Sequence, residues 1–149
     1  MNKSMKIIHK GRVIDPAQNI DRVCDVVIRG TEIVEITPKP LIVFPESSEI
    51  INASDLIVSP GFIDVHTHLR DPGFEWKETI ASAGIAAARG GFTTVCAMPN
   101  TDPPQDNARA IEDLIRRAET ESPVRVLPIG AITKGRLGTS LAPMGEMAD

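Results

Sequence analysis

Residues 59–73 have the sequence SPGFIDVHTHLRDPG. A Pro-Gly break precedes residues 62–65 (FIDV), which are apolar except for Asp64 and predict a short buried β-strand. His66 and His68 follow at the carboxyl end of this strand, and alternate residues of a strand point to the same face. Arg70 continues the row if the extended conformation persists, and the Asp-Pro-Gly after it predicts a turn.

Two neutral imidazoles on one face, at the end of a strand, supply half of a four-coordinate site for zinc or a similar metal. The alternative is that His66 and His68 are surface or turn histidines. Their place between an apolar strand and a turn favours the metal site, and His9 is the only other histidine of the chain. The guanidinium of Arg70 either binds a carboxylate ligand through two N–H donors or forms a surface salt bridge.

Composition narrows the class of protein. The chain has 149 residues, 42% hydrophobic and 24% charged, as is usual for a soluble globular protein. Its net charge of −4 and the lack of a basic block argue against nucleic acid as a partner. No apolar run approaches the roughly 20 residues that cross a bilayer. Cys24 and Cys96 fall in separate predicted strands, which favours reduced thiols in a cytoplasmic protein over a disulfide.

Residues 5–58 predict a small all-β unit without a recognisable cluster of catalytic or metal-binding residues. Arg29-Gly30-Thr31 predicts the turn of a hairpin, and further strands are expected at 6–14, 50–51 and 56–58. We expect this unit to have a structural role.

From Gly61 onward, strands and helices alternate. Helices are expected at 76–89, from an N-cap at Asp106 to residue 119, and from 143 onward, with strands at 93–98 and 124–131. In the second helix, Ile111, Leu114, Ile115 and Ala118 are expected to face inward, and Glu112, Asp113, Arg116 and Arg117 to face water. The alternation predicts an α/β fold with a parallel sheet and right-handed crossovers.

Three such βα units do not close a barrel, which takes eight units and about 250 residues. We therefore expect the chain to be the amino-terminal part of a longer protein.

The motifs PGFIDVHTHLRDPG, KETI, GGFTTVCAMPNTDPP and DN together resemble the amidohydrolase superfamily and, within it, the bacterial type I dihydroorotases. The resemblance is strongest over residues 58–107. It implies a (β/α)8 barrel with a flanking β-domain built from both ends of the chain. Residues 1–58 would then form part of that β-domain, and residues 59–149 the first three βα units of the incomplete barrel.

The resemblance also implies site residues. His66 and His68 correspond to the first two metal ligands, for one or two zinc ions. Arg70 and Asn100 correspond to residues that bind the carboxylate of the substrate, with His68 beside them. Without the resemblance, Asn100 has an equal claim to be a turn residue in a Pro-rich loop.

Other parts of the family's site have no counterpart in this chain. The remaining metal ligands and the proton acceptor are expected beyond Asp149, so no catalytic residue is assigned here. Lys134 is expected to be a solvated loop lysine, and Asp149 is not assigned to the metal. We expect the chain alone to be inactive.

The implied activity interconverts dihydroorotate and N-carbamoyl-L-aspartate in pyrimidine biosynthesis. An allantoinase or hydantoinase is the nearest alternative, although Arg70 and the MPNT loop (residues 98–101) fit it less well. A non-catalytic subunit that scaffolds aspartate transcarbamoylase is an alternative of another class. A homodimer and a complex with aspartate transcarbamoylase are both open as assemblies.

Overall fold

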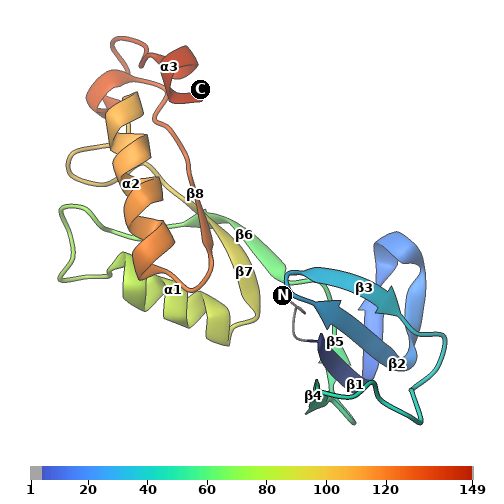
Figure 1. The fold of residues 1–149 in the computed structure, drawn as a ribbon. Helices are drawn as coiled ribbons and strands as arrows, with labels where there is room; N and C mark the ends of the chain where they lie inside the picture. Colours follow the sequence, from blue (N-terminus) through green and yellow to red (C-terminus); the bar gives the residue numbers. More distant parts are fainter. Residues whose placement is uncertain (1–4, 149) are drawn as a thin grey trace. The chain divides into compact units, whose positions relative to one another are not determined.

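The computed structural model describes residues 5–148. The chain forms two compact units, Met1–Pro60 and Gly61–Asp149. In Figure 1 the first unit runs from blue to green and the second from green to red. Within the described residues, no helix is long and apolar enough to cross a bilayer.

The first unit is a single mixed β-sheet. Its strands are β1 (Met5–Asp15), β2 (Ile20–Arg29), β3 (Glu32–Ile36), β4 (Ser48–Asn52) and β5 (Ile57–Val58). β1 and β2 form an antiparallel hairpin through the 3-10 turn η1 (Pro16–Gln18), β3 pairs antiparallel with β2, and β4 and β5 pair parallel with β1. The side chains of Val13, Ile20, Cys24 and Val26 form its apolar core.

Asp25 ties this sheet together from inside. Its buried carboxylate accepts hydrogen bonds from Lys10 N at 2.8 Å, from Leu41 N at 2.9 Å and from the His9 ring at 3.0 Å. Burial alone would raise the pKa of Asp25, but these hydrogen bonds together hold the pKa below its ordinary value. Lys10 has a φ of +60°, and the pairing of β1 with β2 shifts register between Ile8 and Gly11. The carboxylate therefore stabilises an irregular part of β1.

The second unit alternates strands and helices, as the sequence predicts. Its elements are β6 (Phe62–Thr67), α1 (Ile80–Arg89), β7 (Phe92–Ala97), α2 (Ala108–Glu121), β8 (Arg125–Pro128), the 3-10 turn η2 (Lys134–Arg136) and α3 (Met144–Ala148). β6, β7 and β8 form a parallel sheet in that order, and α1 and α2 pack side by side against one face (Figure 1). The core between them contains Leu69, Ile80, Val95, Ala97, Leu114, Ala118 and Val126.

Both helices begin later than the sequence predicts. Thr79 is the N-cap of α1 and forms a reciprocal capping box with Ser82, whereas residues 75–77 form a turn. Asn107, not Asp106, is the N-cap of α2, because its side chain accepts from Ala110 N at 3.1 Å. The Asp106 carboxylate instead accepts from Gly135 N at 2.6 Å, and this hydrogen bond lowers the pKa of Asp106.

Three predictions about burial are wrong. The side chains of Phe62, Ile63 and Val65 are 55%, 61% and 69% exposed, although an apolar run predicts a buried strand. The reason is that β6 pairs only with β7, and the described helices cover only one face of the sheet. On α2, Ile115 was expected to face inward but is 40% exposed, because it lies beside β8, the edge strand of the described sheet. Arg117 was expected to face water, but its guanidinium binds the buried carboxylate of Asp71.

Candidate active site

The candidate site lies where β6 and β7 end. The two strands run parallel, with Thr67 opposite Ala97. Thr67 Oγ1 donates to Cys96 O at 2.8 Å, and Met98 N donates to Thr67 O at 2.8 Å. These bonds hold the carboxyl ends level, so the segments that follow the two strands lie next to each other.

His66 and His68 are exposed at the end of β6. Their ring centroids lie 5.2 Å apart, with the ring planes at 71°. The backbone N–H of His66, not its ring, donates to Asp64 Oδ1 at 3.0 Å. The two imidazole rings therefore lie side by side, and imidazole nitrogens are common metal ligands.

Asn100 meets His68 from the neighbouring strand. It lies three residues after β7, and its Oδ1 is 2.8 Å from His68 Nδ1. An amide oxygen can only accept, so His68 Nδ1 donates in this contact. In the neutral ring, the lone pair is then on His68 Nε2. This is the tautomer that a histidine needs to ligate a metal through Nε2, with its other nitrogen held by a hydrogen bond.

Arg70 does not continue the row of histidines. Its φ is +62°, so the extended conformation ends before it. The side chains of its two neighbours, Leu69 and Asp71, are both buried, so the backbone turns toward the core on either side of Arg70. Among residues 5–148, the Arg70 guanidinium forms no hydrogen bond or ion pair with another side chain, so its N–H donors are open to a ligand.

A complete metal site is not present in the described part of the chain. Between residues 5 and 148, no group of three or more His, Cys, Asp or Glu side chains could hold a metal ion. His66 and His68 fit two positions of a four-coordinate site. Lys134 is exposed in η2, as predicted for a loop lysine. Asp149 lies outside the described residues.

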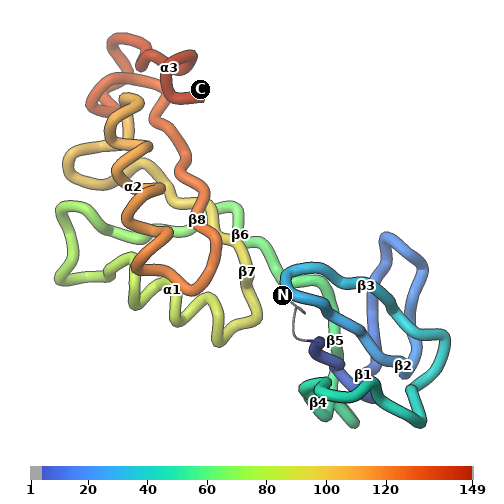
Figure 2. Tube along the Cα trace, viewed as in Figure 1, coloured from blue at the N-terminus to red at the C-terminus, as the bar shows by residue number. Residues whose placement is uncertain are grey.

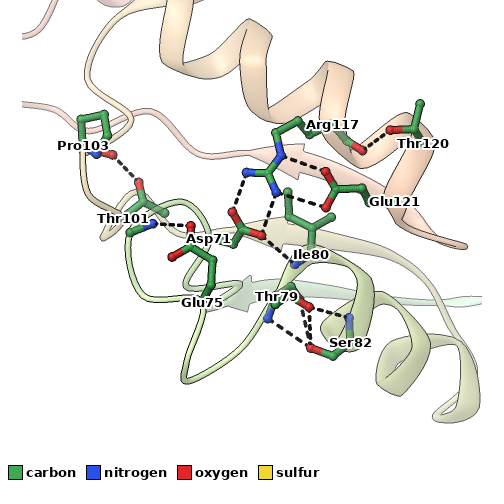
Figure 3. A network of polar contacts seen from close by, with 11 residues as sticks. Asp71, Glu75, Thr79, Ile80, Ser82, Thr101, Pro103, Arg117, Thr120 and Glu121 are labelled. Carbon is green, nitrogen blue, oxygen red and sulfur yellow. Dashed lines mark hydrogen bonds and ion pairs between the residues drawn. The ribbon is translucent and has the colours of Figure 1, made fainter.

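The sequence did not predict the role of Asp71. It was expected only to form part of a turn, but its side chain is buried and bound by Arg117 of α2 (Figure 3). These partners are 46 residues apart, so no local pattern connects them. The only local signal is that Asp71, a charged residue, lies two positions after the apolar Leu69 in the segment that follows β6.

The chain matches known proteins over most of its length. A family model described as dihydro-orotase-like matches residues 55–148. The dihydroorotase of Solibacter usitatus is 49% identical over 141 residues, which is 95% of this chain and 32% of that protein. The dihydroorotase of Geobacter metallireducens is 47% identical over 143 residues, 96% of this chain and 33% of that protein. The chain thus spans about a third of the length of these curated relatives.

Solved structures share the fold. An L-hydantoinase (dihydropyrimidinase) from Arthrobacter aurescens superposes on 92% of this chain with a TM-score of 0.76 and 24% identity, over 29% of its own length. A D-hydantoinase covers 88% of this chain with a TM-score of 0.69 and 29% identity, over 28% of its own length. These likenesses confirm the predicted fold class, the first βα units of an amidohydrolase (β/α)8 barrel preceded by β-structure. With the family model covering well over half of its residues, the chain belongs to the dihydroorotase-like family of amidohydrolases.

Proposed function

We propose that this protein acts as a metal-dependent dihydroorotase, which interconverts dihydroorotate and N-carbamoyl-L-aspartate in pyrimidine biosynthesis. The observation that carries the proposal is the 2.8 Å contact between His68 Nδ1 and Asn100 Oδ1, because it joins the HTHLR and MPNT motifs at one edge of the sheet. The similarity to curated dihydroorotases supports the same activity.

In this proposal His66 and His68 hold zinc, one ion or two, together with ligands from outside the described residues. The histidines fit this role because both are exposed on one edge and His68 Nε2 is free to accept. When bound, the metal supplies Lewis-acid activation of water near neutral pH. The contribution of Asn100 is to hold the His68 ring in the tautomer and orientation that ligation requires.

Arg70 has the role of binding the carboxylate of the substrate. Dihydroorotate and N-carbamoyl-L-aspartate both keep this carboxylate, so one guanidinium can hold the ligand on either side of the reaction. In the hydrolytic direction the ring C–N bond breaks, water adds to the carbonyl carbon, and the nitrogen leaves protonated. Fixing the carboxylate fixes the ring amide relative to the histidines.

Hydantoinase or allantoinase activity is the second candidate, favoured by the hydantoinase names of the structural neighbours. The rings of hydantoin and allantoin carry no carboxylate, so they would leave the charge of Arg70 without a ligand partner. A non-catalytic subunit of aspartate transcarbamoylase would not need His66 and His68, and both are present. A homodimer and a complex with aspartate transcarbamoylase are both compatible with the proposal.

The test is a comparison of substrates. The complete reading frame that contains this chain is expressed, loaded with zinc, and assayed with dihydroorotate, hydantoin and allantoin. We expect the highest kcat/KM for dihydroorotate. A higher kcat/KM for hydantoin or allantoin would reassign the substrate, and zinc-loaded protein that turns over none of the three would contradict the enzymatic proposal.

A further inference from the structure

Asp71 and Arg117 form a partly buried ion pair next to the candidate site. Arg117 Nη1 lies 2.5 Å from Asp71 Oδ1, and Arg117 Nη2 lies 2.9 Å from Asp71 Oδ2 (Figure 3). The same guanidinium also binds Glu121, one turn further along α2, at 2.8 Å and 3.1 Å. The Asp71 side chain is 2% exposed and that of Arg117 is 34% exposed. The carboxylate is therefore almost fully removed from water and depends on one partner for its charge.

This pair fixes the backbone on the carboxyl side of Arg70. Leu69, on the other side, packs in the core and is 3% exposed. Arg70 thus lies between two residues that are anchored by different interactions, one apolar and one ionic. Phe74 N donates to Arg70 O at 2.9 Å, and Ile80 N is 3.4 Å from Asp71 Oδ2, so the same anchor reaches the first residue of α1.

The segment that this ion pair anchors, residues 70–74, also lies against the segment that carries Asn100. Asp102 N donates to Pro72 O at 3.0 Å. Gly73 has a φ of +98°, and a Cβ placed there would lie 2.4 Å from Asp102 O, which excludes any side chain. Figure 2 shows the connection from β6 to α1 passing the connection from β7 to α2. A shift of Asp71 would therefore move both segments of the site.

We propose that Arg117 is a positioning residue, which acts through Asp71 to hold Arg70 where its guanidinium meets the carboxylate of the substrate. This inference rests on the proposed function for the identity of the ligand. Arg117 lies on α2, outside every motif that carries the family resemblance. Its neighbour Arg116 is exposed and binds only Asp113 on its own helix, at 2.9 Å.

An arginine suits this position because its planar fork matches both carboxylate oxygens of Asp71 and still reaches Glu121. Asp71 first, and Glu121 after it, raise the pKa of the Arg117 guanidinium above its ordinary value. An arginine is charged at every working pH even without this shift. A lysine would keep the charge but lose the two parallel bonds, so it would restrain the position of Asp71 less closely.

The first test is a double-mutant cycle in the complete protein. The substitutions Arg117→Met and Arg117→Lys, and the control Arg116→Met, are each made in the wild type and in the Arg70→Ala variant. We expect Arg117→Met to raise KM for dihydroorotate roughly 10- to 100-fold, with bound zinc unchanged and Arg116→Met like wild type. With Arg70→Ala present, the same substitution should have no further effect on KM. An unchanged KM, or an equal rise in both backgrounds, would overturn the inference. If Arg117→Met does not fold, Arg117→Lys decides by the same comparison with a smaller expected rise.

A second test does not depend on the substrate. Hydrogen exchange at the amides of Phe74 and Ile80 reports on the anchored segment, because these amides bond to Arg70 and Asp71. We expect faster exchange in Arg117→Lys than in Arg116→Met. Equal exchange would overturn the positioning role. Failure of dihydroorotate turnover in the wild type, with faster exchange in Arg117→Lys, would refute the proposed substrate and leave the anchor in place.

Discussion

His68 and Asn100 show how two roles can share one amide. Asn100 Oδ1 accepts from His68 Nδ1, whereas the two N–H groups of Asn100 Nδ2 remain donors. The amide can thus hold the His68 ring and still donate to a substrate carboxylate. The family resemblance implied only the second role, because it assigns Asn100 to the substrate carboxylate and says nothing of a contact with the His68 ring.

This arrangement predicts that Asn100→Ala weakens metal binding as well as substrate binding. Loss of a partner that orients a metal ligand lowers metal affinity roughly 10- to 100-fold. Asn100→Asp should retain metal affinity, because its carboxylate still accepts from His68 Nδ1, but it should raise KM by repelling the substrate carboxylate. The measurement is a zinc titration against a competing chelator, alongside steady-state kinetics. Unchanged zinc affinity in Asn100→Ala would show that the contact does not support the ligand.

Residue-level prediction from the sequence worked where the cause was local. The alternation of a strand places His66 and His68 on one edge, and both are exposed there. It failed for Arg70, Asp71 and Arg117, because a left-handed backbone at Arg70 and an ion pair across 46 residues are set by tertiary contacts.

At the scale of elements, Gly84 lets α1 approach the connection between α2 and β8. A Cβ at Gly84 would lie 2.4 Å from Ser122 Oγ and 2.8 Å from Pro123 Cδ. Ser122 Oγ is held in place by bonds to Val124 O at 2.8 Å and from Val124 N at 3.2 Å, and a proline ring has little freedom to move. The contact is therefore rigid on both sides.

Gly84→Ala should lower the free energy of unfolding by about 1–3 kcal/mol, although helix propensity alone would raise it by about 1 kcal/mol. The matched control is Ala88→Gly at an exposed position of α1, which should cost only the propensity difference of about 1 kcal/mol. Urea unfolding followed by circular dichroism measures both. A more stable Gly84→Ala protein would refute the close approach.

In the first unit, Asp25 predicts an acid-sensitive sheet. A carboxyl with a lower pKa in the folded state stabilises the fold above its unfolded pKa of about 3.9, and this contribution is lost as pH falls through the folded pKa. The difference in unfolding free energy between wild type and Asp25→Asn should thus be constant near neutral pH and shrink below about pH 4. Urea unfolding at a series of pH values tests this, with exposed Asp55→Asn expected within about 0.5 kcal/mol of wild type. A difference that stays constant down to pH 2 would contradict it.

The elements themselves were largely predictable. Alternation and turn residues predicted the strands of both units. The spacing of Ile111, Leu114, Ile115 and Ala118 predicted the buried face of α2 correctly except at Ile115, which is exposed. The helix starts were not predictable, because several residues near each start could act as N-cap. Thr79 caps α1 because it bonds with Ser82, and Asp106 does not cap α2 because its carboxylate binds Gly135 N.

At the scale of the whole molecule, the described residues supply only part of a metal site and leave apolar side chains of β6 exposed. Only two nitrogen donors for a metal lie together among residues 5–148, and Ile63 and Val65 of β6 are exposed. We expect the isolated 149-residue chain to bind zinc weakly, to lack dihydroorotase turnover, and to self-associate through its exposed apolar side chains. Zinc stoichiometry, an activity assay and sedimentation velocity test this. A monodisperse monomer with stoichiometric zinc and turnover would show that the site is complete within the chain.

The alternation of strands and helices predicted an α/β fold with a parallel sheet. The resemblance implied the first units of an amidohydrolase barrel, and the solved structures share that fold. What covers β6 could not be predicted from this sequence. Its apolar pattern indicates burial, but the chain spans about a third of the length of its relatives and the described elements cover only one face of the sheet.

The central claim is the proposal that His66 and His68 at the end of β6 bind metal and that Arg70, in the segment after it, binds the carboxylate of the substrate. The most direct measurement compares zinc content and kinetics of His66→Ala and Arg70→Ala in the complete protein. We expect His66→Ala to lose zinc and activity together. Arg70→Ala should keep its zinc and raise KM for dihydroorotate, with about 1.5–3 kcal/mol of charge-assisted binding lost. Normal zinc content in His66→Ala, or an unchanged KM in Arg70→Ala, would contradict the claim.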